Sequence, residues 1–186
     1  MKKLNILLMF VFSALFAFSC TDEEEVPVKV QVQTFDIMLD NANSIPMVMD
    51  RDETGDIQMN LYDDNTLEFT ITINDLSGSD ALTMAHVHTG DVVTAGGVAI
   101  TLVDGTDISF SGNTATGEIL LTDDEVATLQ GSDVYVNVHS SEQPAGLVRG
   151  QIDQTIDNAY NVAMSPSNEI PAIEGRNETG SAFIRI

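Results

Sequence analysis

The sequence predicts an all-β fold in which antiparallel strands close a sandwich or a barrel, with one short helix. The main observation is that apolar and polar residues alternate in runs rich in Val, Ile, Thr and Phe, whereas helical periodicity is almost absent. Gly, Asn and Asp cluster between these runs at short intervals, as is typical of antiparallel strands. With 186 residues, the chain is long enough for one domain of ordinary size and part of a second.

The strands are expected wherever this alternation is unbroken. The expected strands cover residues 29–39, 56–62, 66–73, 116–121 and 133–139, with turn-forming clusters at 62–66, 76–80, 103–107 and 111–117. The helix is expected in LTDDEVATLQG, residues 121–131, because Thr122 and Glu125 have the spacing of a capping box and Gly131 can end the helix.

The N-terminus predicts export and lipid attachment. Residues 1–19 combine two lysines, an apolar run and small residues, which is the pattern of a secretory signal peptide rather than of a membrane span. The stretch FAFSC resembles a bacterial lipobox, so cleavage would leave Cys20 as a lipid-carrying N-terminus that holds the protein on a membrane. The alternative is an ordinary signal peptide with an incidental cysteine. Because Cys20 is the only cysteine, no disulfide framework is possible.

The acidic residues bear on localisation and partners. Residues 20–27 form an acidic, extended tether, which resembles the export signal of surface-exposed lipoproteins of the Bacteroidetes. An outer-membrane lipoprotein exposed on the cell surface is therefore expected, and a plain linker facing the periplasm is the alternative. After removal of residues 1–19, five basic residues remain against 29 acidic ones, a net charge of −24 that excludes nucleic acid as a partner.

An internal repeat divides the mature chain. Residues 35–61 align without gaps on residues 160–186, with an offset of 125. We therefore expect one complete domain at 28–158 and the start of a second, truncated repeat at 159–186, unless the last strands of a single domain echo its first. A lone strand pair cannot bury its apolar face, so residues 160–186 should pack poorly. The identical positions are Asn43/Asn168, Ile45/Ile170, Pro46/Pro171, Arg51/Arg176, Glu53/Glu178, Thr54/Thr179 and Gly55/Gly180.

The repeat also tests a possible calcium loop. The stretch DRDETGD places Asp50, Asp52 and Asp56 at alternate positions, as a calcium loop does. The second copy keeps the arginine, glutamate, threonine and glycine of this turn but replaces all three aspartates. A solvated turn is therefore favoured over a calcium site.

The three histidines are the candidate site. His86 and His88 lie two residues apart, so on a strand they project from the same face, while Val87 points to the other. His139 shares a face with Tyr135 and Asn137 in VYVNVH. If the two strands are neighbours, three imidazoles converge, which suits zinc or copper with an open fourth position. In the alternative interpretation the histidines are structural and bond to backbone and to polar neighbours such as Asn137 and Arg149.

These motifs resemble a known family. AHVHTG, GEILLT and YVNVHSSEQPAGLVRGQI, preceded by an NSIP…TG turn, resemble the CHRD domain first described in chordin. The resemblance covers residues 34 to about 155 and implies an immunoglobulin-like or Cu,Zn superoxide dismutase-like Greek-key sandwich in extracellular proteins, without an established enzymatic activity. The signature positions are His86, His88, Asn137, His139, Pro144, Gly146, Arg149, Gly150 and Gln151.

Three functions are compatible with these observations. The first is a non-enzymatic, lipid-anchored surface protein that binds a protein or glycan. The second is a copper- or zinc-binding domain that uses His86, His88 and His139, and the third is a structural spacer without a ligand. No catalytic constellation is recognisable, and no cofactor is expected apart from that metal. Arg149, in a chain with seven basic residues, is predicted to pair with a buried carboxylate or with carbonyls.

Overall fold

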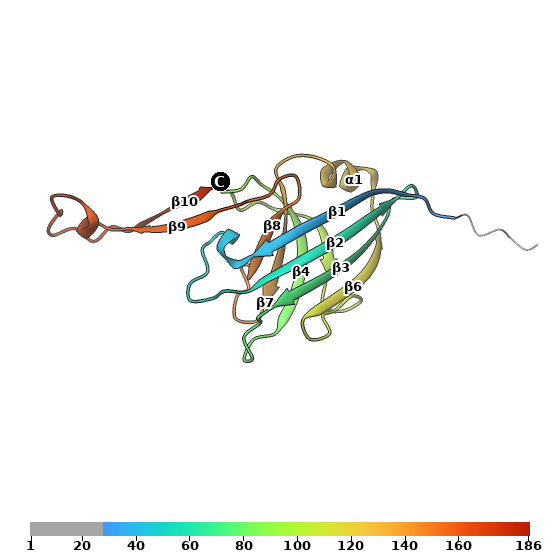
Figure 1. Ribbon diagram of the computed structural model, residues 1–186, viewed down its shortest axis with the longest axis horizontal. Coiled ribbons are helices and arrows are strands. Elements are labelled where there is room, and N and C mark those ends of the chain that lie inside the picture. Colours follow the sequence, from blue (N-terminus) through green and yellow to red (C-terminus); the bar gives the residue numbers. More distant parts are fainter. Residues whose placement is uncertain (1–27) are drawn as a thin grey trace, which may run out of the picture.

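Eight antiparallel strands form one sheet that nearly closes on itself in the computed structural model, which describes residues 28–186. The strand order is β5-β4-β7-β8-β1-β2-β3-β6, and the two outermost strands, β5 and β6, lie in contact. Figure 1 shows β1, β2, β3 and β6 in one layer, with β4, β7 and β8 behind them. The bounds are β1 Gln31–Asp40, β2 Thr54–Tyr62, β3 Thr66–Asn74, β4 Leu82–Thr89, β5 Val98–Val103, β6 Thr114–Leu120, β7 Val134–Ser140 and β8 Val148–Gln151.

The alternating apolar and polar residues of the sequence lie on opposite faces of this sheet. From Phe35 onwards in β1, and along β2 and β3, every second side chain is buried, while most of those between them face outwards. The inward side chains of both layers form one core, in which the buried residues include Phe35, Ile37, Leu39, Ile57, Met59, Phe69, Ile71, Val87, Ile100, Leu102, Val134, Val136 and Val138. The predicted all-β antiparallel fold is confirmed.

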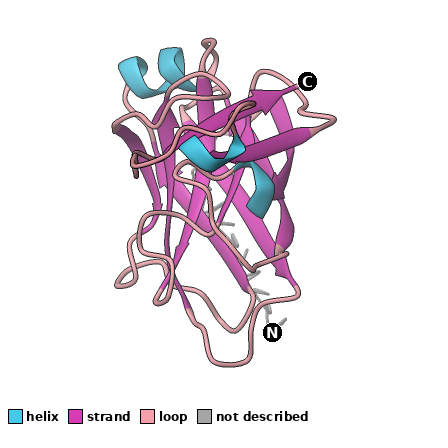
Figure 2. Ribbon diagram, turned by 90° about the vertical axis from the view of Figure 1, so that its left-hand side faces the viewer, coloured by secondary structure: helices cyan, strands magenta, loops and turns pink. Residues whose placement is uncertain are grey.

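One short helix interrupts the strands, as predicted. Helix α1, Asp123–Leu129, connects β6 to β7 and lies at one end of the barrel (Figures 1 and 2). The Thr122 side chain accepts a hydrogen bond from the backbone N–H of Glu125, and the Glu125 carboxylate accepts one from the backbone N–H of Thr122. This capping box satisfies two N–H groups that would otherwise be unpaired, and the fully buried Leu129 anchors the other end.

Residues 159–186 form a hairpin outside the barrel that has the register of the first hairpin. Strands β9, Ala159–Met164, and β10, Gly180–Arg185, form a separate two-stranded sheet that extends away from the barrel (Figure 1). Gly180 pairs with Met164 as Gly55 pairs with Leu39, so the register is the same in both copies. A short 3-10 turn follows the first strand of each, at Asn41–Asn43 and Pro166–Asn168. The β9–β10 hairpin is largely exposed, as expected for a strand pair without a second layer.

An arginine–glutamate pair closes both hairpins but is buried in only one of them. Arg51 donates to Glu53 at 2.7 Å, and Arg176 donates to Glu178 at 2.8 Å. In the first hairpin Arg51 also contacts Asp80 at 2.8 Å and Glu142 at 3.0 Å, so it links the β1–β2 connection to the loops at 75–81 and 141–147. These loops precede β4 and follow β7, the two strands that carry the histidines.

The predictions for the N-terminus are not tested by the structure. The signal peptide at 1–19, Cys20 and the tether at 20–27 lie outside the described residues. Within residues 28–186, no helix has the length and apolar character needed to cross a bilayer.

Candidate metal centre

The histidines lie on two neighbouring strands near the middle of the back layer. On β4, Ala85 and Val87 are fully buried in the core, so His86 and His88 point to the opposite face. Strand β7 runs antiparallel beside β4, with His86 opposite Asn137, His88 opposite Tyr135, and His139 opposite Met84. This register brings His139 onto the same face as His86 and His88, as the metal hypothesis requires.

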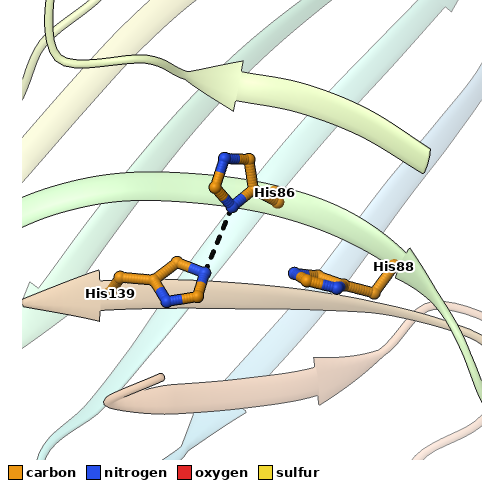
Figure 3. A group of neighbouring side chains, drawn as sticks. All are labelled: His86, His88 and His139. Carbon is orange, nitrogen blue, oxygen red and sulfur yellow. Dashed lines mark hydrogen bonds between the residues drawn. The ribbon is translucent and has the colours of Figure 1, made fainter. Parts of the chain in front are cut away.

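The three imidazoles converge on one point (Figure 3). One nitrogen atom of each ring lies within 4.8 Å of the corresponding atoms of the other two. The closest pair is His86 Nδ1 and His139 Nε2, at 3.2 Å. Among residues 28–186 this is the one group of three or more His, Cys, Asp or Glu side chains with the spacing of a metal site. Asp50, Asp52 and Asp56 are not such a group.

Backbone carbonyls orient two of the rings. His88 Nδ1 donates to the Gly96 carbonyl at 3.1 Å, and His139 Nδ1 donates to the Pro144 carbonyl at 3.0 Å. With the proton on Nδ1, each ring directs the lone pair of Nε2 towards the other histidines. Such carbonyl contacts are the usual support of metal-ligating histidines.

One of these lone pairs has no partner. His88 Nε2 is buried and forms no hydrogen bond, while His139 Nε2 accepts from His86 Nδ1. A buried ring nitrogen without a partner is destabilising for the free protein, because it has lost water without gaining a bond. A bound cation would remove this deficit.

Burial keeps the histidines neutral. Burial, together with the neighbouring His139 and His88, lowers the pKa of His86 to about 4. Burial also lowers the pKa of His88 and of His139, although the hydrogen bonds to Gly96 and Pro144 act in the opposite direction. Neutral imidazoles at pH 7 are the form that binds a metal.

A stack of three side chains supports His88 from behind. The rings of His88 and Tyr135 are parallel within 7°, with centroids 5.0 Å apart. The Arg149 guanidinium lies 3.5 Å from the centroid of Tyr135. The Tyr135 hydroxyl accepts a hydrogen bond from Gly96 N at 3.1 Å, so the residue that orients His88 is itself held by the stack.

Arg149 holds the loop that contains Gly96. Its guanidinium donates to the carbonyls of Asp91 and of Thr94, the latter at 3.1 Å, and to Gln151 Oε1 at 2.9 Å. Gln151 in turn donates to the Gly90 carbonyl. Arg149 forms no ion pair among the described residues, so of the two predicted kinds of partner it uses carbonyls.

The remaining signature residues shape the loop before β8. Asn137 Nδ2 donates to the Ala145 carbonyl, and a Cβ at Gly146 would lie 2.4 Å from the Asn137 amide. Gly146 also has φ +133°, a backbone conformation that favours glycine. A Cβ at Gly150 would lie 2.3 Å from the Met38 carbonyl, where β8 approaches β1.

The structural alternative is therefore correct in part. His88 and His139 do bond to backbone, but Asn137 and Arg149 contact carbonyls of the surrounding loops rather than the histidines. Sequence reasoning missed Gly96 and the supporting role of Tyr135. For Tyr135 a signal was present, because it alternates with Asn137 and His139, whereas Gly96 lies in a loop whose path no local pattern specifies.

Comparison with known proteins supports the resemblance in the signature motifs. A family model described as the CHRD domain matches residues 35–152, well over half of the chain, and this range includes all three histidines and Arg149. No curated protein and no solved structure shows a significant match.

Proposed function

The chain belongs to the CHRD domain family, and from this premise we propose that it is a non-enzymatic, extracytoplasmic protein whose CHRD domain binds copper or zinc through His86, His88 and His139. The observation that carries the proposal is the convergence of three neutral imidazoles, one of which has a buried nitrogen without a partner. This observation favours metal binding, the second of the three functions considered from the sequence, over a purely structural role of the histidines.

The spacing of the nitrogens fits a metal of this kind. Two nitrogens bound to one tetrahedral zinc ion at 2.0–2.1 Å lie about 3.3 Å apart. His86 Nδ1 and His139 Nε2 are already 3.2 Å apart, and metal binding would move the His86 proton from Nδ1 to Nε2. His88 has to approach only modestly, since all three nitrogens lie within 4.8 Å. A metal bound there would supply a Lewis-acidic or redox-active centre, while the chain contributes neutral ligands and oriented rings.

Binding rather than catalysis is proposed because the chain has few possible metal ligands. A dismutase of the Cu,Zn type requires more histidines than the three in this chain.

We also propose that Cys20 carries lipid and anchors the protein to a membrane, which the sequence pattern at residues 1–20 supports. Binding of an extracellular protein or glycan, predicted from the sequence, stays a prediction and is compatible with a metal centre displayed outside the cytoplasm.

The test is metal content without a histidine tag. The mature chain, with Cys20→Ser to prevent lipidation, is purified without chelator, analysed for bound metals, and then titrated with zinc and with copper. We expect close to one ion per chain, lost in His88→Ala and retained in the control Thr70→Ala on the exposed face of β3. A chain that stays metal-free in excess zinc and copper, or that binds equally well as His88→Ala, would refute the proposal.

The three histidines simplify a second readout. Because the chain contains no others, every imidazole signal in a nuclear magnetic resonance spectrum arises from this site. Metal binding at the site should shift all of these signals together, whereas binding to surface carboxylates should leave them unchanged.

A further inference from the structure

We propose that the site prefers monovalent copper and that Met84 provides a thioether ligand beside the three imidazoles. This inference rests on the proposed metal-binding function and specifies which ion the site takes. Two independent observations carry it: the position of Met84, and the charge of the surroundings.

Met84 belongs to the same row of side chains as the histidines. Along β4, Met84, His86 and His88 alternate with the buried Ala85 and project from the outer face. Residues two apart on a strand are separated by about 6.6–6.8 Å. Across the strands, Met84 lies directly opposite His139. It is therefore a neighbour of two of the three proposed ligands.

The Met84 side chain is not locked into the core. It is 39% exposed, whereas the buried methionine of the core, Met59, is fully enclosed. Methionine is unbranched and has three rotatable side-chain bonds, so its sulfur can adapt to a nearby ion. Thioether sulfur is a soft ligand that selects Cu(I), while zinc and Cu(II) are well served by imidazole alone.

The charge around the site disfavours a divalent ion. The metal-binding group contains no carboxylate, so a bound ion keeps its full charge. Behind His88 lies the Arg149 guanidinium, 1% exposed, separated from the imidazole by the Tyr135 ring and without an ion pair. The Asp91 carboxylate is near enough to favour the charged form of Arg149, but it accepts hydrogen bonds from its own loop instead.

A monovalent ion is repelled by Arg149 half as strongly as a divalent ion. Because Coulomb energy scales with the product of the charges, an ion of charge +1 is repelled by Arg149 half as strongly as one of charge +2 at the same position. Neutral ligands, a soft sulfur and a nearby guanidinium without an ion pair all favour the lower oxidation state of copper.

The experiment is a competition for Cu(I). The mature chain with Cys20→Ser is mixed anaerobically with Cu(I) and a colorimetric Cu(I) chelator in the presence of ascorbate, and zinc affinity is measured separately. The variant Met84→Leu removes the sulfur and keeps most of the volume. Met38→Leu, on the exposed face of β1, is the matched control because it removes a methionine sulfur elsewhere.

We expect tighter binding of Cu(I) than of zinc, a loss of about 10–100-fold in Cu(I) affinity for Met84→Leu, and a zinc affinity unchanged within about twofold. X-ray absorption of the Cu(I) protein should show one sulfur neighbour that is absent in Met84→Leu. Preference for zinc, or full Cu(I) affinity without a sulfur neighbour, would overturn this inference and leave the proposed function intact. A chain that binds neither ion would overturn both.

Discussion

Arg149 offers the most direct test of how the loop around the histidines is held. Replacement by alanine removes three charge-assisted hydrogen bonds, to the carbonyls of Asp91 and Thr94 and to Gln151, together with the stacking on Tyr135. Hydrogen bonds to charged groups contribute about 1.5–3 kcal/mol each, and a cation over an aromatic ring about 0.5–2 kcal/mol. The gross loss would thus exceed about 5 kcal/mol.

Two effects reduce this figure. The guanidinium is 1% exposed, and its removal relieves the cost of burying a charge, the same cost that lowers the pKa of Arg149 to about 10. The Asp91 and Thr94 carbonyls belong to exposed residues, so water can replace the arginine. We therefore expect Arg149→Ala to lower the free energy of unfolding by about 2–4 kcal/mol.

Denaturant unfolding of the metal-free protein measures this loss as a shift of the midpoint at constant slope. Arg149→Lys keeps the charge but cannot reach three acceptors in a fixed fork, so it should lose about half as much. Arg176→Ala, whose side chain is 62% exposed, should change stability by less than about 0.5 kcal/mol. An unchanged midpoint for Arg149→Ala, or a lysine variant as stable as the wild type, would show that these contacts do not hold the fold.

Three further predictions concern pH, backbone conformation and buried charge. Since a histidine in the unfolded chain titrates near pH 6.5 and burial lowers the pKa of His86 to about 4, the unfolded chain binds more protons in this range. The metal-free protein should therefore lose about 1–2 kcal/mol of stability between pH 7 and pH 5, after allowance for solvent screening, as followed by thermal unfolding; a flat profile would contradict neutral, buried histidines. Gly146→Ala should destabilise by at least about 2 kcal/mol, because it adds a Cβ at φ +133° beside Asn137, whereas Gly112→Ala at an open turn should cost less, as circular dichroism melts would reveal. Arg51→Ala leaves two almost fully buried carboxylates without a cation and should cost about 3–5 kcal/mol in urea unfolding at pH 7, while equal stability to wild type would exclude this role of the ion pairs.

Much of the fold can be predicted from the local sequence pattern, whereas the site depends on which distant strands pair with each other. Alternation placed His86 and His88 on one face and His139 with Tyr135 and Asn137 on another strand, and the structure confirms both placements. That β4 and β7 are neighbours, with His139 opposite Met84, is set by strand order and register, which the alternation of a single strand does not specify.

The features that the sequence did not predict also depend on contacts or backbone directions that no local pattern specifies. Strand β5 was not predicted, because VAITLV is short and mostly apolar, and a buried strand of this length does not alternate clearly. The carbonyls of Gly96 and Pro144 that orient the rings come from loops, where side-chain pattern carries little information on backbone direction. The Arg51–Glu53 pair was visible as a repeated motif, but its buried partner Asp80 lies 29 residues away in the chain.

The equal register of the two hairpins has a consequence for folding. The inward positions of β1, Phe35, Ile37 and Leu39, correspond to Tyr160, Val162 and Met164 in β9, all of them apolar. Two segments of one polypeptide therefore offer the same face to the single place between β3 and β8. We expect them to compete for it while the chain collapses, with an outcome that depends on which segment arrives first and which buries more apolar surface. The N-terminal hairpin has the advantage of leaving the ribosome first, whereas its arginine gives no advantage, because the second segment carries Arg176 at the same position. We therefore expect the second segment to act as a competitor during folding, and the order of synthesis to favour the first hairpin.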